Sequence, residues 1–191
     1  MTKRNFSEIK ASARKNLKGN LGTSFLAEVA GTSINMVATI IPFGGTIISG
    51  PIDVGTQGIY VKNTDQEKPR FLDLFNGFKE NFGENFLMRL VKSIFIFLWS
   101  LLFIIPGLVK SYSYAMTEYL MARNQGMTAM EAIRESRRLM NGNKMRLFLL
   151  NLSFIGWTLL LGVTLGLAAF YVVPYMKTAK TEFFNDIYFA A

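Results

Sequence analysis

Long apolar stretches, separated by shorter basic segments, are the main pattern along this chain. The run from Ser93 to Val109 contains no charged residue, and the run from Leu147 to Met176 contains none over thirty residues. About 20 apolar residues are enough to cross the hydrocarbon core of a bilayer, whereas buried helices of soluble domains rarely need that length. The pattern therefore predicts helices that span a membrane.

Six such helices are predicted, as three hairpins in one integral membrane domain over residues 1–191. The fold class is all-α, a polytopic transmembrane helical bundle. The returning helices are the more polar ones, and the pattern leaves open whether they cross completely; a four-span chain with two helices on the membrane surface is the alternative. The predicted helices are residues 21–41, 47–62, 86–105, 107–123, 145–165 and 167–187, with turns at Pro42 to Gly45, at Pro106-Gly107 and near Gly166.

Short internal matches support three related hairpins. Met88-Arg89-Leu90 and Met145-Arg146-Leu147 open the third and fifth predicted helices, and Trp99 and Trp157 follow them in the same order. Tripeptides also recur by chance in apolar sequence, so duplication of a hairpin is a hypothesis that rests on the common order.

The basic residues of the chain are concentrated in the segments that separate the apolar spans. Of its 21 Lys and Arg residues, 6 precede Leu21, 6 lie from Lys62 to Lys92, and 6 lie from Arg123 to Arg146. Basic segments between apolar spans stay on the cytoplasmic side, which predicts a multi-pass protein of the cell membrane with both termini in the cytoplasm. Topology and anionic lipids then explain the net charge of +8, and no nucleic-acid partner is expected.

Residues 1–20 are predicted to form a basic amphipathic helix before the first span. Because this polar segment is long, a retained first span is expected rather than a cleavable signal peptide. We interpret the basic side chains as contacts for anionic lipid headgroups of the inner leaflet, with packing of the helix on the protein itself as the alternative. The apolar positions on one face are Phe6, Ile9, Ala13 and Leu17. The candidate headgroup contacts are Lys10, Arg14 and Lys15.

Residues 63–85 and 124–144 are predicted to be connecting helices on the cytoplasmic surface of the membrane. In the second segment, Thr128 and Glu131 have the spacing of a capping box. A groove for a partner protein is the competing use of both helices. The first segment carries an aromatic-rich face, formed by Phe71, Leu72, Leu74, Phe75, Phe78 and Phe82. The candidate headgroup contacts of the second are Arg134, Arg137 and Arg138.

Six ionisable residues fall inside predicted spans, where a charge costs several kcal/mol unless it is paired or wetted. Ion pairs that orient the bundle are one interpretation, and a polar path for an ion, a proton or a lipid headgroup is the other. Asp53 and Lys110 each lie shortly after a turn, so they are predicted to pair in the outer half of the bundle. The six residues are Glu28, Asp53, Lys110, Glu118, Lys177 and Lys180.

The composition removes most enzymatic chemistry. The chain has no Cys and no His, so a thiolate nucleophile, the commonest general base and the usual zinc ligands are missing. No nucleotide-binding loop of the P-loop or Rossmann kind occurs in the sequence. An enzyme is not expected, and no metal site or cofactor is predicted.

Several short motifs are spread along the chain. They are Leu17-Lys18-Gly19-Asn20, Leu74-Phe75-Asn76-Gly77-Phe78, Ile104-Ile105-Pro106-Gly107, the helix from Glu131 to Ser136 with Leu139-Met140-Asn141-Gly142, and Phe154-Ile155-Gly156-Trp157. Together they resemble the motifs of the domain of unknown function 975 family. This resemblance covers nearly the whole chain and implies a small integral membrane protein, found mainly in Gram-positive-type bacteria, without an established activity. The second predicted helix is more polar than the family's pattern because it holds Asp53 and Gln57.

Two classes of function remain after these exclusions. The first is a non-catalytic membrane protein that acts through the lipid surface or a partner protein, for example in envelope stress or assembly. The second is a small transporter or channel for an ion, a small solute or a lipid. A wetted cleft lined by the charged residues of the spans would favour the second class, and a dry bundle with exposed inner helices would favour the first.

Overall fold

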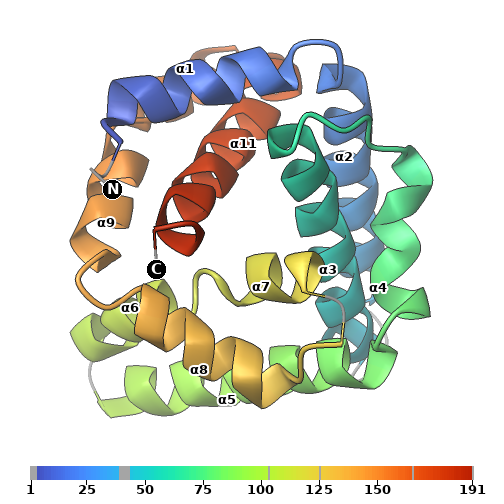
Figure 1. Cartoon of the computed structure of the whole chain (residues 1–191), viewed down its shortest axis with the longest axis vertical. Helices are drawn as coiled ribbons and strands as arrows, with labels where there is room; N and C mark the ends of the chain where they lie inside the picture. Colours follow the sequence, from blue (N-terminus) through green and yellow to red (C-terminus); the bar gives the residue numbers. More distant parts are fainter. Residues whose placement is uncertain (1–3, 39–43, 103, 125, 165, 191) are drawn as a thin grey trace.

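The computed structural model describes residues 4–38, 44–102, 104–124, 126–164 and 166–190, and all regular structure in these ranges is helical. The prediction of an all-α chain is therefore confirmed. Figure 1 shows α1 crossing the top of the molecule, α2 and α3 on its right side, and α5 and α8 across its lower part. The helices are α1 (Phe6–Leu17), α2 (Leu21–Ala38), α3 (Gly44–Thr64), the 3-10 helix η1 (Phe71–Phe75), α4 (Asn76–Lys79), α5 (Phe82–Leu102), α6 (Ile104–Ser113), α7 (Thr117–Arg123), α8 (Ala129–Leu139), α9 (Lys144–Leu152), α10 (Ile155–Val163) and α11 (Ala169–Tyr188).

Three helical hairpins form the frame of the molecule, and two of the six predicted helices are broken. The first hairpin pairs α2 with α3, the second pairs α5 with α6 and α7, and the third pairs α9 and α10 with α11. A turn at residues 114–116 separates α6 from α7, and Ser153 and Phe154 separate α9 from α10. Local hydrogen bonds of the turn, such as Thr117 N–H to the Tyr114 carbonyl at 3.2 Å, replace the regular helical ladder at the first break.

The turns of the hairpins differ in part from the prediction. Pro106 lies inside α6 rather than in a turn. It occupies the first turn of the helix, where a backbone N–H has no helical partner and Pro is therefore tolerated. Gly44 and Gly45 already belong to α3, while residues 42 and 43 of the same predicted turn lie outside the described residues. Gly166, with φ of +86°, marks the third turn as predicted.

The hairpins close into a ring through the short helices that precede them. Each short helix packs on the returning arm of a hairpin other than the one that follows it in the chain: η1 and α4 pack on α3, α8 packs on α7, and α1 packs on α11 of the last hairpin. The three returning arms also carry equally spaced threonines, Thr56, Thr117 and Thr178, all buried and each donating to a carbonyl of the preceding turn. This common feature supports the hypothesis of three related units.

The N-terminal helix α1 packs on the protein. Its predicted apolar face is correct, since Ile9, Ala13 and Leu17 are buried against α11 and its neighbours. The start of the helix is held by the backbone N–H of Asn5, which donates to the Glu8 carboxylate at 3.0 Å. Of the two alternatives for this segment, packing on the protein is the one that the structure shows.

The first connecting segment was predicted to form one helix, but the structure shows two short ones, η1 and α4. Asp73 and Leu74 of η1 are buried, and Leu74 belongs to a small core cluster with residues of α2 and α3. The chain turns again at Asn81, which has φ of +53°, before α5 begins. The second segment does contain a helix, α8, and the predicted capping box is present: Glu131 N–H donates to Thr128 Oγ1 at 3.3 Å.

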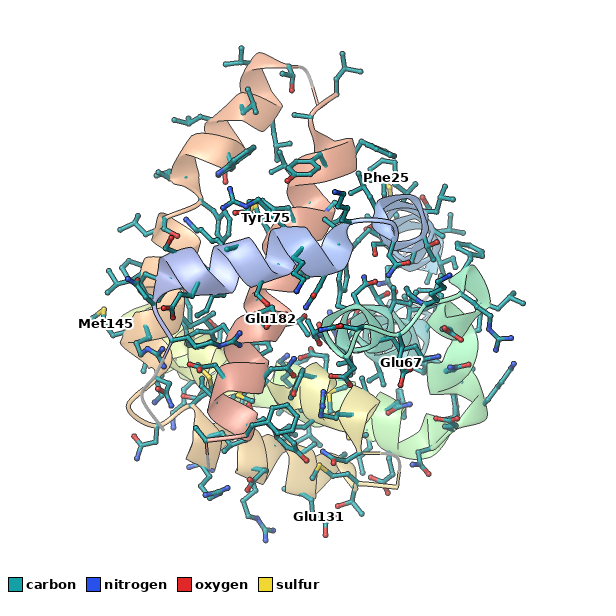
Figure 2. All side chains as sticks on the ribbon, turned by 45° about the horizontal axis from the view of Figure 1, so that its top comes forward. Phe25, Glu67, Glu131, Met145, Tyr175 and Glu182 are labelled. Atoms are coloured by element: carbon teal, nitrogen blue, oxygen red, sulfur yellow. The ribbon has the colours of Figure 1, made fainter. Side chains whose placement is uncertain are left out.

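Polar groups gather inside the molecule while many large apolar side chains lie on its outside. Buried polar residues include Asn63, Thr117 and Glu182, whereas Leu159 of α10 is 67% exposed. In Figure 2, Met145 lies at the outer edge and Glu182 lies among the helices. Among the described residues, one helical segment, 144–163, is long and apolar enough to cross a membrane by length and composition.

Candidate functional site

A cavity of about 530 Å³ lies between the three hairpins, and charged side chains from several helices line it. Its charged lining residues are Glu28 of α2, Asp53 of α3, Lys92 of α5, Glu118 of α7, and Lys177 and Lys180 of α11. Five of the six ionisable residues that the sequence singled out in the spans therefore meet in one place. Hairpins that are distant in sequence each contribute at least one charge.

Ion pairs between helices hold most of these charges. Lys92 of α5 donates a hydrogen bond to Glu118 of α7. Lys177 Nζ of α11 is 3.3 Å from Glu28 Oε1 of α2. The interpretation as ion pairs that orient the bundle therefore agrees with the geometry of Glu28 and Glu118.

Asp53 pairs with Arg89, and the predicted pair with Lys110 is wrong. Arg89 Nη1 of α5 donates to Asp53 Oδ2 at 2.7 Å, and the Asn35 amide donates to Asp53 Oδ1 at 3.3 Å. Lys110 instead lines a separate pocket with basic residues such as Arg137 of α8. The prediction compared only the distances of the two residues from their turns. In Figure 1, α5 runs transversely to α2 and α3, along the lower edge of the molecule, so similar distances from a turn do not mean similar positions in the bundle.

Two buried polar atoms of the cavity have no hydrogen-bond partner among the described residues. Glu28 Oε1 and Asn35 Oδ1 are buried and accept no hydrogen bond within the described part of the chain. Glu28 Oε1 is close to Lys177, but the contact lacks hydrogen-bond geometry. Because a buried polar atom without a partner costs about 1–3 kcal/mol, and because the space is polar and large enough for water, water or a polar solute in the cavity would satisfy both atoms.

Lys180 gives the cavity its excess of positive charge. Among the described residues it forms no ion pair, and its Nζ lies 5.5 Å from the centre of the Phe184 ring. The three carboxylates of the cavity face four cations once Arg89 is counted. A small anion in the cavity would balance this charge.

The sequence prediction missed Arg89 and Lys92, which it assigned to a cytoplasmic basic cluster. Both lie on α5, three residues apart, so they share one face of that helix. Their position within the predicted helix 86–105 was a usable signal, because charges inside a span point toward the bundle interior. The sequence analysis counted both residues with the basic segment from Lys62 to Lys92, and so it did not assign them to the interior of the bundle.

The candidate headgroup contacts of α1 are partly engaged with the protein. Lys10 Nζ donates to the Ser153 carbonyl at 3.1 Å and lies 4.3 Å from the centre of the Phe154 ring. Partial burial, together with the positive charge of Arg14, lowers the pKa of Lys10. Arg14 lies 5.9 Å from the ring centre of Tyr175, and Lys15 is exposed. Arg134, Arg137 and Arg138 are exposed on α8 and share the pocket of Lys110.

The fold and the cavity define an all-helical protein with an apolar core, a cavity lined by charged groups and many large apolar side chains on its outer surface. The sequence model of the family described as "Protein of unknown function (DUF975)" matches residues 104–190 of the chain. The matched region runs from α6 to α11 and includes Glu118, Lys177 and Lys180, while Glu28 and Asp53 lie outside it. The chain matches no curated protein and no solved structure.

Proposed function

We propose that this protein is a non-catalytic, multi-pass protein of the bacterial cell membrane that admits a small polar solute, preferably an anion, into its central cavity. It would act as a small transporter or channel. The observation that carries this proposal is the combination of a charged cavity and an apolar outer surface. Charges from several hairpins at one central site are typical of transport proteins, in which polar residues within the membrane line the substrate path.

The apolar outer surface supports the membrane location. Exposed apolar residues occur on α2, α5 and α10, for example Met36, Phe97 and Leu159. Large apolar side chains exposed along several helices fit a surface that lies against lipid. The charges of α5 and α11 that line the cavity point into the bundle, so they would not meet lipid.

The basic segments support an orientation with both termini in the cytoplasm. Arg4 of the N-terminal segment bonds to Glu182 near the end of α11 at 3.1 Å, so the two ends of the chain belong to the same side. The other class of function, action through lipids or a partner protein, is favoured by the basic pocket next to α8. A role in envelope stress or assembly stays a prediction.

Single cysteines test access to the cavity, since the chain itself contains none. In proteoliposomes, Ser111→Cys places a thiol in the cavity lining. We expect membrane-impermeant methanethiosulfonates to modify it, the anionic reagent faster than the cationic one because of the excess positive charge. Modification should also reduce chloride efflux, with chloride as the probe ion.

The matched control is Leu159→Cys on the apolar surface of α10. A thiol in lipid does not ionise and should stay unmodified. Equal modification at both positions would show that α10 is in water and would contradict the membrane location. A protected thiol at position 111 would show that the cavity is closed to solutes, and unchanged chloride efflux after modification would exclude this cavity as the path.

A further inference from the structure

A second pocket, about 480 Å³ in volume, lies where α6 meets α8 and the turn before α9. Five cations from three segments converge on it, and none of the described residues that line it is a carboxylate. Its cationic lining residues are Lys110, Arg134, Arg137, Arg138 and Lys144, and Ser113 and Asn141 complete the lining. This pocket is separate from the charged cavity of the proposed transport path, in which carboxylates nearly balance the cations.

Three of the five cations of this pocket have no ion pair among the described residues. Arg138 pairs with Glu135 at 2.6 Å, but Arg134, Arg137 and Lys144 form no ion pair within the described ranges. Arg134, Arg137 and Arg138 follow one another at three- and four-residue intervals, so they share one face of α8. Five like charges around one space repel each other, and an anion within it would remove this repulsion.

Hydrogen bonds between α6 and α8 fix the walls of the pocket. Ser136 of α8 is buried, and its hydroxyl donates to the Ser113 carbonyl at 2.9 Å and accepts from the Met116 N–H at 3.2 Å. The break between α6 and α7 frees these backbone groups for the contact. On the opposite face of α8, Ala132 and Ile133 are buried in the core. The arginine face is therefore held in place before any ligand binds, which lowers the entropy cost of binding.

Exposed apolar residues follow the basic lining along both helices. Val109 is next to Lys110 on α6, and on α9 Met145 is next to Lys144, with Phe148 one turn after Lys144; all three are exposed. A ligand that fits both features has an anionic head and apolar chains. A free anion such as inorganic phosphate would use the cations only and would leave these apolar side chains uncovered.

We propose that this pocket binds the phosphate headgroup of an anionic phospholipid, with the acyl chains of that lipid along α6 and α9. Arginine is well suited to this role because its planar guanidinium can donate two parallel hydrogen bonds to phosphate. The proposal rests on the membrane location, but it does not require the central cavity to conduct. It assigns Lys110, which was predicted to pair with Asp53, to lipid binding together with α8.

Native mass spectrometry of the purified full chain in detergent tests the proposal, with phosphatidylglycerol and phosphatidylcholine as probes. We expect wild type to retain phosphatidylglycerol and not phosphatidylcholine. The variant Arg137→Gln with Lys144→Gln should retain it at least about 10-fold less, because each basic residue near an anionic lipid contributes a sizeable part of the attraction. The charge-preserving variant Lys144→Arg should keep most of the binding.

The matched control is Lys68→Gln with Lys79→Gln, which removes the same charge from exposed residues outside the pocket. This control should bind phosphatidylglycerol like wild type. Equal loss in both double variants would mean attraction by net charge alone and would overturn the proposal. Displacement of the lipid by inorganic phosphate would also overturn it, since the pocket would then be a site for a free anion. Thiol access at position 111 reports the other cavity, so the two proposals can fail separately.

Discussion

At the scale of single residues, two glycines set the contact between the first hairpin and the segment that follows it. A Cβ atom at Gly55 of α3 would lie 1.9 Å from the Leu74 carbonyl oxygen, and one at Gly77 of α4 would lie 2.1 Å from the Pro51 carbonyl oxygen. Both contacts are with backbone atoms, which cannot move away as a side chain can. The backbones of α3 and of η1 and α4 therefore touch directly, and any side chain at these positions would separate them.

We predict that Gly55→Ala destabilises the protein by about 3 kcal/mol or more, because the added methyl group forces a backbone shift in a packed region. Thermal melting in detergent measures the effect. Gly58→Ala, one turn further along α3, is the matched control. The nearest atom to its new Cβ would be the Ala122 Cβ at 3.9 Å, and Ala favours a helix over Gly by up to about 1 kcal/mol. A melting temperature of Gly55→Ala equal to that of the control would contradict the contact.

At the scale of elements, Asp73 connects the short helix η1 to α3. Its side chain accepts from the Arg70 N–H at 2.8 Å and from Lys62 Nζ at 2.9 Å, and it is only 3% exposed. Burial by itself favours the neutral acid, but the Arg70 N–H and the Lys62 ammonium outweigh it and hold the pKa of Asp73 below its usual value. One carboxylate thus caps η1 and also fixes it to the neighbouring helix.

The lowered pKa gives a prediction with a definite sign. Because the folded-state pKa lies below the unfolded-state value, the stabilisation by Asp73 is complete above the unfolded pKa and is lost as pH falls through the folded pKa. At about pH 7, Asp73→Asn should reduce the free energy of unfolding by about 1–3 kcal/mol. The difference from wild type should shrink once the pH falls below about 4.

Melting of wild type and variant over a pH series checks this dependence. Glu67→Gln, at an exposed position two residues after Asp65, is the control and should show no difference from wild type at any pH. A difference between wild type and Asp73→Asn that stays constant down to the lowest pH at which both fold would contradict a role for the charged form.

At the scale of the whole molecule, the N-terminal segment closes the ring of hairpins. Besides the apolar face of α1, Arg4 bonds to Glu182 and to Asp186 of α11 at 3.1 and 3.4 Å. Arg146 of α9 donates to the same Asp186 at 3.2 Å and to the Arg4 carbonyl at 3.1 Å. The start of the chain therefore binds the third hairpin rather than its own neighbour in sequence, and this contact joins the first unit to the last.

Replacing a buried leucine and an exposed one by alanine tests which residues lie inside this ring and which lie on its outer surface. Leu17→Ala should cost about 2–5 kcal/mol of stability, because the residue is 2% exposed in the main core cluster and the change leaves a cavity. Leu26→Ala makes the same chemical change on α2, where Leu26 is 57% exposed, and should cost less than about 1 kcal/mol. Equal losses in detergent melting would show that the outer face of α2 is covered as fully as the core.

Local sequence was sufficient for most of the elements. The helical periodicity of α1, the cap of α8 and the left-handed Gly166 depend on neighbouring residues, so each could be predicted without a fold. The breaks in the second and third hairpins could not be predicted from neighbouring residues. The stretch from Tyr114 to Met116 is as apolar as the helices around it, and the chain turns there because Ser136 on a distant helix binds the freed backbone.

The sequence by itself determined that the chain is helical, forms three hairpins and carries charges inside its apolar segments. The composition and spacing of residues encode these properties locally. Only the tertiary structure decided which charges meet: Asp53 with Arg89, and Lys110 with the arginines of α8. The physical reason is that the partner of a charge depends on the angle and depth at which helices cross. Packing contacts such as those of Gly55 and Leu17 set that angle, between residues distant in the chain.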